Sequence, residues 1–266
     1  MKSQVVILIT GVSSGIGKTC FDYLFAKGYK VYGTSRFAEP DNAFLLKMDV
    51  TKPNSIRSAV NYVLQKEGKI DVLINNAGIS VVGSAEMTLT EDARQQIETN
   101  FWGVVNTTNA VLPTMRQQHA GKIINISSLA GLFAIPYQSY YTASKFALEG
   151  YSESLRMELK KRNIQVSLIE PGDFKTEISQ NRILSNTEEN DDYSLGLHSA
   201  MEIIVKGERQ GDDTKKIARV VAHIIRSRNP RLRYLVGKPM DLLAAKLKRI
   251  LPPRLFEWII MNHYKL

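Results

Sequence analysis

Val5-Val6-Ile7-Leu8-Ile9-Thr10-Gly11-Val12-Ser13-Ser14-Gly15-Ile16-Gly17 is the stretch of sequence that decides the fold. Five apolar residues predict a strand buried on both faces, and glycines follow at a G-x-x-x-G-x-G spacing. Residues 19–27 are expected to form a helix, with Gly28 just past its end, and residues 30–34 a second strand. A glycine-rich turn between a strand and a helix presents backbone N–H groups to the phosphates of a dinucleotide.

The remaining chain repeats this alternation of short apolar strands and longer helices. Strands are expected at residues 45–48, 72–74, 123–126, 166–169 and 234–236, and helices at 53–66, 90–118, 141–161 and 214–226. The pattern predicts an α/β protein with a Rossmann-like, doubly wound parallel sheet, folded as one domain over residues 1–266. Residues 176–211 are expected to form a substrate lid, and residues 239–266 a C-terminal helical extension.

Composition indicates an enzyme-sized globular protein, with 266 residues, 44% hydrophobic and 23% charged. The single cysteine, Cys20, excludes an internal disulfide and suits a reducing compartment. No apolar run reaches the length of a signal-peptide core or a membrane span, so a cytoplasmic location is expected. The four histidines show no ligand spacing and predict no metal site.

The net charge of +9 is unevenly distributed along the chain. Residues 214–254 hold twelve Lys and Arg against one acid, or +11, which leaves −2 for the remainder. Either a solvated basic surface or contact with an anionic membrane or an acidic partner explains this segment. No nucleic-acid-binding motif accompanies it, so no nucleic-acid partner is expected.

The end of the second predicted strand indicates the cofactor. A site that reads a ribose 2′-OH would place an acid near Ser35, whereas this chain has Ser35-Arg36. An Arg fork pairs with a 2′-phosphate, and the Ser13 hydroxyl would add a hydrogen bond. NADP(H) is therefore preferred, with NAD(H) as the alternative in which Arg36 is only a solvated loop residue.

Tyr141 and Lys145 indicate proton-transfer chemistry. On a helix, this i,i+4 spacing puts the phenol and the ammonium on one face. A free phenol has a pKa of about 10, and a fixed ammonium beside it favours the phenolate. The pair is thus a way to make a tyrosine exchange protons near neutral pH, although an isolated pair of this kind is usually structural.

Taken together, these features resemble the short-chain dehydrogenase/reductase family, and especially its NADP-dependent hydroxysteroid- and retinol-type members. The resemblance covers about residues 5–176 and implies a seven-stranded parallel sheet with helices on both faces. Its motifs occur in order at predicted strand ends: Thr10-Gly-x-x-x-Gly-Ile-Gly17, Asp49, Asn75-Asn-Ala-Gly78, Asn100, Ser128, Tyr141-x-x-x-Lys145 and Pro171-Gly-x-x-x-Thr176.

The resemblance implies a role for each catalytic residue. Tyr141 would be the acid/base, and Lys145 would lower the pKa of its phenol and hold the nicotinamide ribose. Ser128 would hydrogen-bond the substrate oxygen, and Asn100 would hold a water that links Lys145 to solvent. Tyr140 is the competing tyrosine, but only Tyr141 has a lysine four residues later.

The resemblance also implies the cofactor contacts. Asp49 and Val50 would contact the adenine, and Thr176 the nicotinamide carboxamide. The complete expected set is Gly11, Ser13, Ser14, Gly15, Ile16, Gly17, Ser35, Arg36, Asp49, Val50, Asn76, Ala77, Gly78, Tyr141, Lys145, Pro171, Gly172 and Thr176.

The expected substrate is a lipophilic ketone or alcohol, of the steroid, retinoid or lipid kind. The apolar residues on which this depends are Leu132, Phe133, Ile135, Tyr137, Phe174, Ile178, Ile183 and Leu184. A 3-oxoacyl-carrier or 3-oxoacyl-CoA reductase is the nearest alternative, and a non-catalytic dinucleotide sensor or scaffold is the alternative of another class.

Two further expectations concern partners. The resemblance implies a homodimer or homotetramer. The C-terminal helices combine apolar faces with Lys246, Lys248, Arg249 and Arg254, as helices at a membrane surface do. They would make a weak peripheral membrane contact, or else cover the substrate cleft or a subunit interface.

Overall fold

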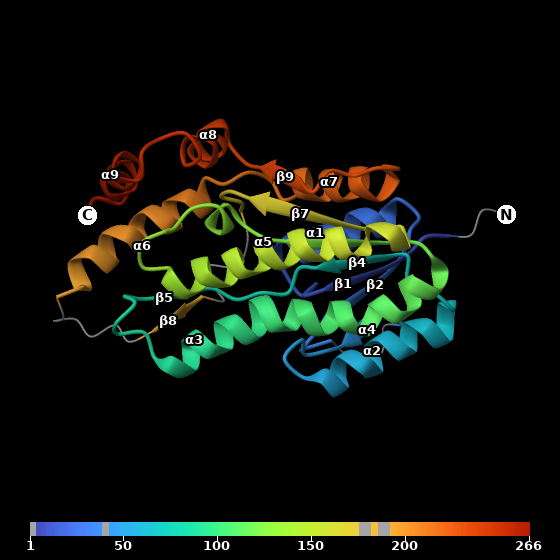
Figure 1. Ribbon diagram of the computed structural model, residues 1–266. Coiled ribbons are helices and arrows are strands. Elements are labelled where there is room, and N and C mark those ends of the chain that lie inside the picture. The colour runs from blue at the N-terminus through green and yellow to red at the C-terminus, as the bar shows by residue number, and fades with distance from the viewer. Residues whose placement is uncertain (1–3, 39–42, 176–181, 186–191) are drawn as a thin grey trace.

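The computed structural model describes residues 4–38, 43–175, 182–185 and 192–266. Seven parallel strands form its central sheet in the spatial order β3-β2-β1-β4-β6-β7-β9 (Figure 1). The strands are β1 Val6–Thr10, β2 Lys30–Ser35, β3 Leu45–Lys47, β4 Val72–Asn75, β6 Gly121–Ile126, β7 Ile164–Pro171 and β9 Arg233–Val236. The order reverses between β1 and β4, which confirms the predicted doubly wound sheet.

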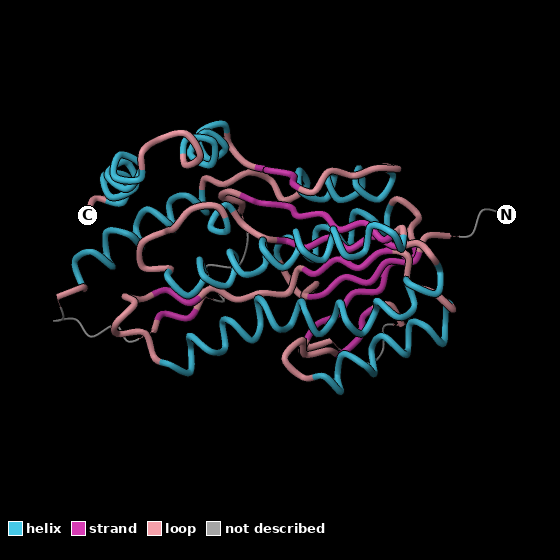
Figure 2. The backbone as a smooth tube through the Cα atoms, in the orientation of Figure 1, coloured by secondary structure: helices cyan, strands magenta, loops and turns pink. Residues whose placement is uncertain are grey.

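Helices cover both faces of the sheet (Figure 2). One face packs against α1 Gly15–Ala26 and α7 Lys215–Arg226. The other packs against α2 Pro53–Glu67, α4 Gly103–Gln118 and α5 Ser139–Leu159. Two 3-10 turns, η2 Leu129–Gly131 and η3 Lys160–Arg162, flank α5 in the chain.

Strand β1 is apolar from Val6 to Ile9 because helices cover both faces of the sheet. Ile7 and Ile9 pack in the cluster that includes α1 and α7, whereas Val6 and Leu8 pack in the cluster that includes α2, α4 and α5. All four side chains are at most 1% exposed. Because side chains alternate along a strand, only an apolar residue at every position satisfies both layers.

The first helix begins earlier than predicted. It was expected from residue 19, but α1 starts at Gly15, so the last two glycines of the turn lie in its first helical turn. Gly17 is buried, and a Cβ there would overlap the Gly11 carbonyl oxygen and the Asn76 side-chain amide. The missing side chain at this position lets the start of α1 lie directly against the ends of β1 and β4.

The helix predicted at residues 90–118 is not continuous. The segments α3 Thr90–Ile97 and α4 are joined by a π-helical turn, η1 Glu98–Trp102, which contains Asn100. Leu89 occupies the position before the first turn of α3. A π turn inside a helix often lies at a functional site, because it redirects the side chains of that turn.

A second, two-stranded sheet was not predicted. β5 Val81–Val82 pairs in parallel with β8 Ile183–Leu184, which fixes part of the segment expected to be a lid. The described part of that segment also includes α6 Ser194–Arg209. Residues 176–181 and 186–191 of the expected lid lie outside the described residues.

Two C-terminal helices, α8 Pro239–Leu247 and α9 Pro253–Tyr264, lie outermost in the molecule beside the C-terminus (Figure 1). Phe256 and Ala245 pack with Leu129 and Phe133 of the segment that follows β6. Tyr264 packs with α6. The extension is therefore anchored beside the carboxyl ends of the strands. Among the described residues, we find no helix long and apolar enough to span a membrane.

Candidate active site

A cleft of about 1190 Å³ lies at the carboxyl ends of the strands. Pockets for small ligands usually measure about 300–1,000 Å³, so this cleft has room for a dinucleotide together with a second molecule. The glycine turn lines one part, the loop after β6 and the start of α5 line the centre, and α8 and α9 line another part.

The glycine turn is suited to phosphate. Ser14 precedes the first turn of α1, no side chain caps the backbone N–H groups there, and that turn contains no acidic residue. These N–H groups carry the positive end of the helix dipole. Of the predicted cofactor residues, the following line the cleft: Gly11, Ser13, Ser14, Gly15, Ile16, Ser35, Arg36, Asp49, Val50, Asn76, Ala77, Gly78, Tyr141, Lys145, Pro171 and Gly172.

Two predicted cofactor residues are not among the residues that line the cleft. Gly17 was expected to touch the cofactor, but it is buried beneath the turn and does not line the cleft. Its role is packing, because the space of its missing side chain is occupied by Gly11 and Asn76. Thr176 lies outside the described residues.

Thr10 and Asn76 hold the turn in place. The Thr10 hydroxyl accepts hydrogen bonds from the backbone N–H groups of Asn76 and Ala77, both at 3.0 Å. The Asn76 side-chain amide donates to the carbonyl oxygens of Thr10 and Gly11, at 3.0 and 2.8 Å. Gly11 has a φ of +72°, which favours glycine. The main role of Asn76 here is thus to tie the end of β4 to the turn.

The part of the cleft beside the end of β2 has an exposed cation, Arg36, and an acid, Asp49, that is bonded to its own loop. The Arg36 guanidinium lies 5.5 Å from the centre of the Phe37 ring. The Asp49 carboxylate accepts from the backbone and the hydroxyl of Thr51, at 2.9 and 2.8 Å. Arg36 is thus exposed beside the cleft, and Asp49 stabilises the turn of its own loop.

The structure brings Ser128, Tyr141 and Lys145 together. The Ser128 hydroxyl lies beside the Tyr141 hydroxyl. The Lys145 ammonium lies 5.7 Å from the centre of the Tyr141 ring and donates to the Ile126 carbonyl at 3.0 Å. Burial raises the pKa of the Tyr141 phenol, and the neighbouring Ser128 hydroxyl partly counteracts this. Burial lowers the pKa of Lys145 to about 8.

Tyr140 is directed elsewhere. Its hydroxyl donates to the Ala85 carbonyl at 3.2 Å, and the residue does not line the cleft. The choice of Tyr141 from the lysine spacing therefore agrees with the geometry.

Asn100 is buried in the π turn beside these groups. Its side-chain oxygen accepts from the Ile79 backbone N–H at 2.8 Å, and its amide donates to the Ile79 carbonyl at 3.0 Å and the Ser144 hydroxyl at 3.2 Å. Gln96, which the sequence did not suggest, also binds this segment, donating to the Ile79 carbonyl at 2.6 Å. Asn100 thus ties the loop after β4 to α5, and its water-holding role stays a prediction.

Only part of the predicted apolar lining faces the cleft. Phe133, Ile135, Phe174 and Ile183 line it, whereas Leu132, Tyr137 and Leu184 do not, and Ile178 lies outside the described residues. Further apolar lining comes from the C-terminal helices: Met240, Leu243, Leu247, Phe256, Ile259 and Ile260. Four carboxylates that no motif signalled also line the cleft: Asp173, Glu202, Glu208 and Asp241.

The fold and the site are those of a dinucleotide-dependent oxidoreductase. Among the described residues, no group of three His, Cys, Asp or Glu is placed to hold a metal ion. Residues 5–186 match the family model described as short chain dehydrogenase, and the chain belongs to this family.

Comparison with individual proteins agrees with this assignment. A protein named 3-ketodihydrosphingosine reductase, from Bacteroides thetaiotaomicron, is 43% identical over 262 residues, which is 97% of each chain. A solved structure of a short-chain dehydrogenase from Streptomyces avermitilis is 33% identical, covers 98% of each chain and has a TM-score of 0.83.

A nicotinamide dinucleotide is the cofactor of this enzyme class. A serine dehydrogenase solved as a complex with NADP+ is 25% identical, with a TM-score of 0.77 over 89% of this chain and 96% of that one. The uncapped helix N-terminus and the residues that line the cleft around it in this chain fit the same kind of molecule.

We expect replacement of Gly17 by Ala to damage the cofactor site. The new methyl group must push α1 away from Gly11 and Asn76, which costs about 1–3 kcal/mol of stability and misplaces the phosphate-binding N–H groups. Thermal unfolding should show a lower midpoint, and a fluorescence titration with NADPH should show at least tenfold weaker binding.

Gly150→Ala provides the matched control. Gly150 lies in α5, is exposed, and has no atom within 4 Å of the added Cβ. Its replacement should keep cofactor affinity unchanged and raise stability by up to about 1 kcal/mol. Equal effects of the two substitutions would contradict the packing role of Gly17.

Proposed function

We propose that the protein is an NADPH-dependent reductase of a lipophilic ketone, in particular of a long-chain 3-keto sphingoid base. The observation that carries this proposal is the position of the apolar part of the cleft. Phe133, Leu247 and Phe256 lie in the same cleft as Ser128 and Tyr141. A hydrocarbon chain can therefore be held there while its carbonyl reaches the polar groups.

The proposed chemistry follows from the three assembled side chains. Ser128 and Tyr141 would donate hydrogen bonds to the carbonyl oxygen, and Tyr141 would transfer its proton to it as negative charge develops. The Lys145 ammonium would stabilise the resulting phenolate, and Asn100 would hold the water that restores the proton. When bound, the nicotinamide supplies the hydride.

The substrate proposal also draws on the relative from Bacteroides. Its name specifies 3-ketodihydrosphingosine, and its identity of 43% extends over 97% of both chains, including the C-terminal helices. A 3-oxoacyl thioester reductase remains the competing substrate class. The assembled Ser128, Tyr141 and Lys145 disfavour the sensor or scaffold alternative, which has no need of them.

We expect reduction of 3-ketodihydrosphingosine with NADPH, and a kcat/KM that falls at least tenfold when the chain is shortened to a few carbons. NADPH consumption measures both. Tyr141→Phe should lower kcat by at least a thousandfold because it removes the transferable proton, whereas Tyr140→Phe should stay within about threefold of the native enzyme. A preference for 3-oxoacyl thioesters or for short polar ketones would contradict the proposal.

The preference for NADPH rests on Arg36 and Ser13. Both line the cleft near Ser35, and Arg36 is exposed, so a 2′-phosphate would meet a cation there rather than an acid. NADH is the alternative.

We expect NADPH to bind at least ten times more tightly than NADH, as measured by fluorescence titration. Arg36→Asp should reverse this order, because a carboxylate repels a phosphate and accepts from ribose hydroxyls. Arg57→Asp makes the same charge change on α2, outside the cleft lining, and should leave the preference unchanged. Tighter NADH binding by the native protein would overturn the proposal.

The C-terminal helices expose a second apolar face, which is proposed to contact an anionic membrane surface. Leu255 is 44% exposed, Ile250 77% and Trp258 60%, and none of the three lines the cleft. Lys246, Lys248 and Arg249 are exposed on the same part of the chain. The opposite faces of these helices cover the cleft, so a lipid substrate would enter from the bilayer beside them.

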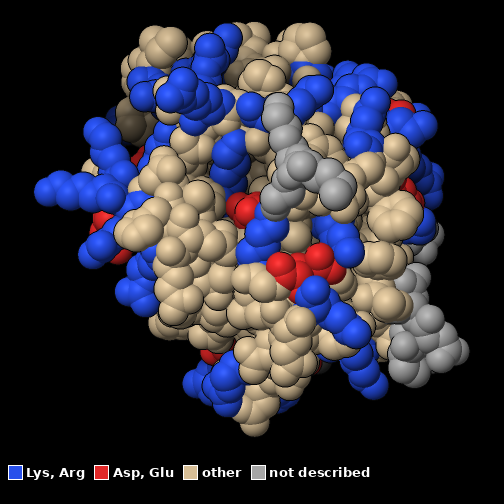
Figure 3. All heavy atoms as spheres, turned by 90° about the vertical axis from the view of Figure 1, so that its right-hand side faces the viewer, with Lys and Arg blue, Asp and Glu red and all other residues tan. Residues whose placement is uncertain are grey.

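The basic residues of the segment 214–254 lie on two separate parts of the molecule. The turn between α7 and β9 lies at the right-hand edge of Figure 1, far from α8 and α9. Figure 3 shows that face, where many Lys and Arg side chains surround fewer acids. Only the part of the basic segment on α8 and α9 thus belongs to the proposed membrane surface. A cytoplasmic location and a dimer or tetramer remain parts of this proposal.

We expect the native protein to sediment with vesicles that contain anionic lipid. Exchange of Lys246, Lys248 and Arg249 for Glu should abolish sedimentation, since the apolar face alone binds weakly. The control is the same exchange at residues 160–162, which are Lys-Lys-Arg after α5. This variant should still sediment with the vesicles. Absence of binding by the native protein would contradict the membrane proposal. Concentration-dependent self-association that is lost with the exchange of Lys246, Lys248 and Arg249 would indicate a subunit interface instead.

A further inference from the structure

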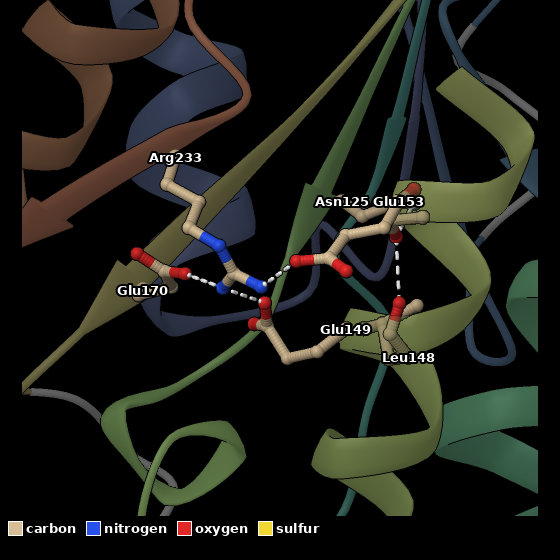
Figure 4. A network of polar contacts seen from close by, with 7 residues as sticks. Asn125, Leu148, Glu149, Glu153, Glu170 and Arg233 are labelled. Atoms are coloured by element: carbon tan, nitrogen blue, oxygen red, sulfur yellow. Dashed lines mark hydrogen bonds and ion pairs between the residues drawn. The ribbon is translucent and has the colours of Figure 1, made fainter. Parts of the chain in front are cut away.

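A buried cluster of carboxyl groups lies one helical turn beyond Lys145. Arg233 of β9 forms ion pairs with Glu149 of α5 and Glu170 of β7, and with Glu153 of α5 at 2.6 Å (Figure 4). Glu149 is 4% exposed and Glu170 is fully buried. The side chain of Glu153, by contrast, is 48% exposed. The proposed mechanism uses none of these groups.

The two buried carboxyls cannot both be ionised at low cost. One arginine serves both, and one oxygen of each, Oε1 of Glu149 and Oε2 of Glu170, has no hydrogen-bond partner among the described residues. Burial raises the pKa of Glu170 to about 7, and the nearby charge of Glu149 adds to the increase. Burial also raises the pKa of Glu149, but the charge of Arg233 opposes this. The two carboxyls therefore compete for one guanidinium, and a proton on Glu170 would leave that guanidinium to a negative Glu149.

The face of α5 that includes the catalytic groups extends to Glu149. Tyr141, Lys145 and Glu149 are spaced i, i+4 and i+8 along the helix, so they lie on one face. Each meets the chain that leaves β6. Tyr141 lies beside the Ser128 hydroxyl, and Lys145 donates to the Ile126 carbonyl. The Ser127 hydroxyl and Oε1 of Glu149 both lie beside Gly131. A Cβ added to Gly131 would be 3.0 Å from the hydroxyl and 3.2 Å from the carboxylate oxygen.

Lys145 is 7% exposed, and the acceptor described for its ammonium is a neutral carbonyl. A buried ammonium needs a counter-charge, and the carboxylate on its own helix face is that of Glu149. We infer that Glu149 is a positioning residue of the proton transfer, which keeps Lys145 in its ammonium form while Glu170 and Arg233 keep Glu149 negative. Consistent with this, the charge of Glu149 raises the pKa of Lys145 against the lowering by burial.

The charges that face Glu149 come from each element packed around it. These are Lys145 and Glu153 from α5, Glu170 from β7 and Arg233 from β9. The neutral Ser127 hydroxyl, from the loop after β6, lies beside them. With Glu170 neutral, two positive and two negative charges alternate. Removal of the negative charge at Glu149 leaves an excess positive charge, which disfavours the ammonium and must lower the pKa of Lys145.

The test compares Glu149→Gln with two controls of similar shape. In Glu149→Gln, the pKa of Lys145 should fall by at least half a unit from about 8, as followed by NMR titration of the lysine Cε signals without cofactor or substrate. Glu170→Gln keeps the neutral form of that residue, and Glu153→Gln changes an exposed contact of the same arginine. Neither should move the pKa of Lys145 by more than about 0.2 units.

Activity provides the second readout, and it rests on the proposed function. As the pH rises, the kcat of ketone reduction should begin to fall at a pH at least half a unit lower in Glu149→Gln than in the native enzyme. The reason is that the ammonium that stabilises the phenolate loses its proton at a lower pH in the variant. Glu149→Asp, which retains the charge, should restore most of the native profile. A uniform loss of activity with an unmoved profile and an unchanged pKa of Lys145 would reduce Glu149 to a structural role and overturn the inference.

Two arrangements keep the test decisive. If Glu149→Gln does not fold, the double variant Glu149→Met/Arg233→Met replaces the ion pair by apolar side chains, which buried sites often tolerate. The shift of the Lys145 pKa should keep its sign, because the negative member of the pair shares the helix face of Lys145. If no ketone is reduced, the NMR titration still decides the inference, so failure of the proposed function is seen separately.

Discussion

The packing of α5 across the end of β6 is the interaction on which the whole site depends. Its register is fixed by polar bonds inside the core. Asn125 of β6 donates to the Ser152 hydroxyl of α5 at 2.8 Å and accepts from Asn75 of β4 at 2.9 Å, and Asn75 donates to Thr108 of α4 at 3.1 Å. A slip of α5 by one residue would turn its catalytic face by about 100° and leave these buried amides unpaired. The same bonds that hold the layers together therefore aim Tyr141 and Lys145 into the cleft.

The sheet and its order were predictable because their cause is local and periodic. Runs such as residues 5–9 are apolar at every position, and in an α/β protein this indicates a strand covered on both faces. The departures have equally definite causes. Phosphate-binding glycines look like a turn in the sequence, yet α1 already begins at Gly15, and residue 17 in its first turn must be glycine because Gly11 and Asn76 occupy the space of a side chain. The π turn around Asn100 arises from tertiary bonds to Ile79, which no helix propensity encodes.

The site was predictable where its residues follow strand ends or a fixed helical spacing. Tyr141, Lys145, Ser128 and the turn belong to this group. The apolar contribution of α8 and α9 was visible only as amphipathic helices, because nothing in their sequence says which side faces the cleft. The cluster around Arg233 left no signal at all. Glu149, Glu170 and Arg233 are distant in sequence and polar, and polar residues are usually read as surface; only the sheet order, which places β7 between β6 and β9, brings them together.

Burial sets two opposing requirements in this site. Exclusion of water strengthens the hydrogen bonds from Ser128 and Tyr141 to a developing negative charge, but it also favours the neutral forms of the phenol and the amine. A neutral amine would give the phenolate no electrostatic support. Carboxylate and guanidinium groups that alternate outward from Lys145, through Glu149 and Arg233 to the half-exposed Glu153, resolve this conflict, since each buried charge has an opposite neighbour and the last one reaches solvent. On this view, the ion pairs in the wall of the sheet support the proton transfer from outside the active site, because without them burial would lower the pKa of Lys145 further.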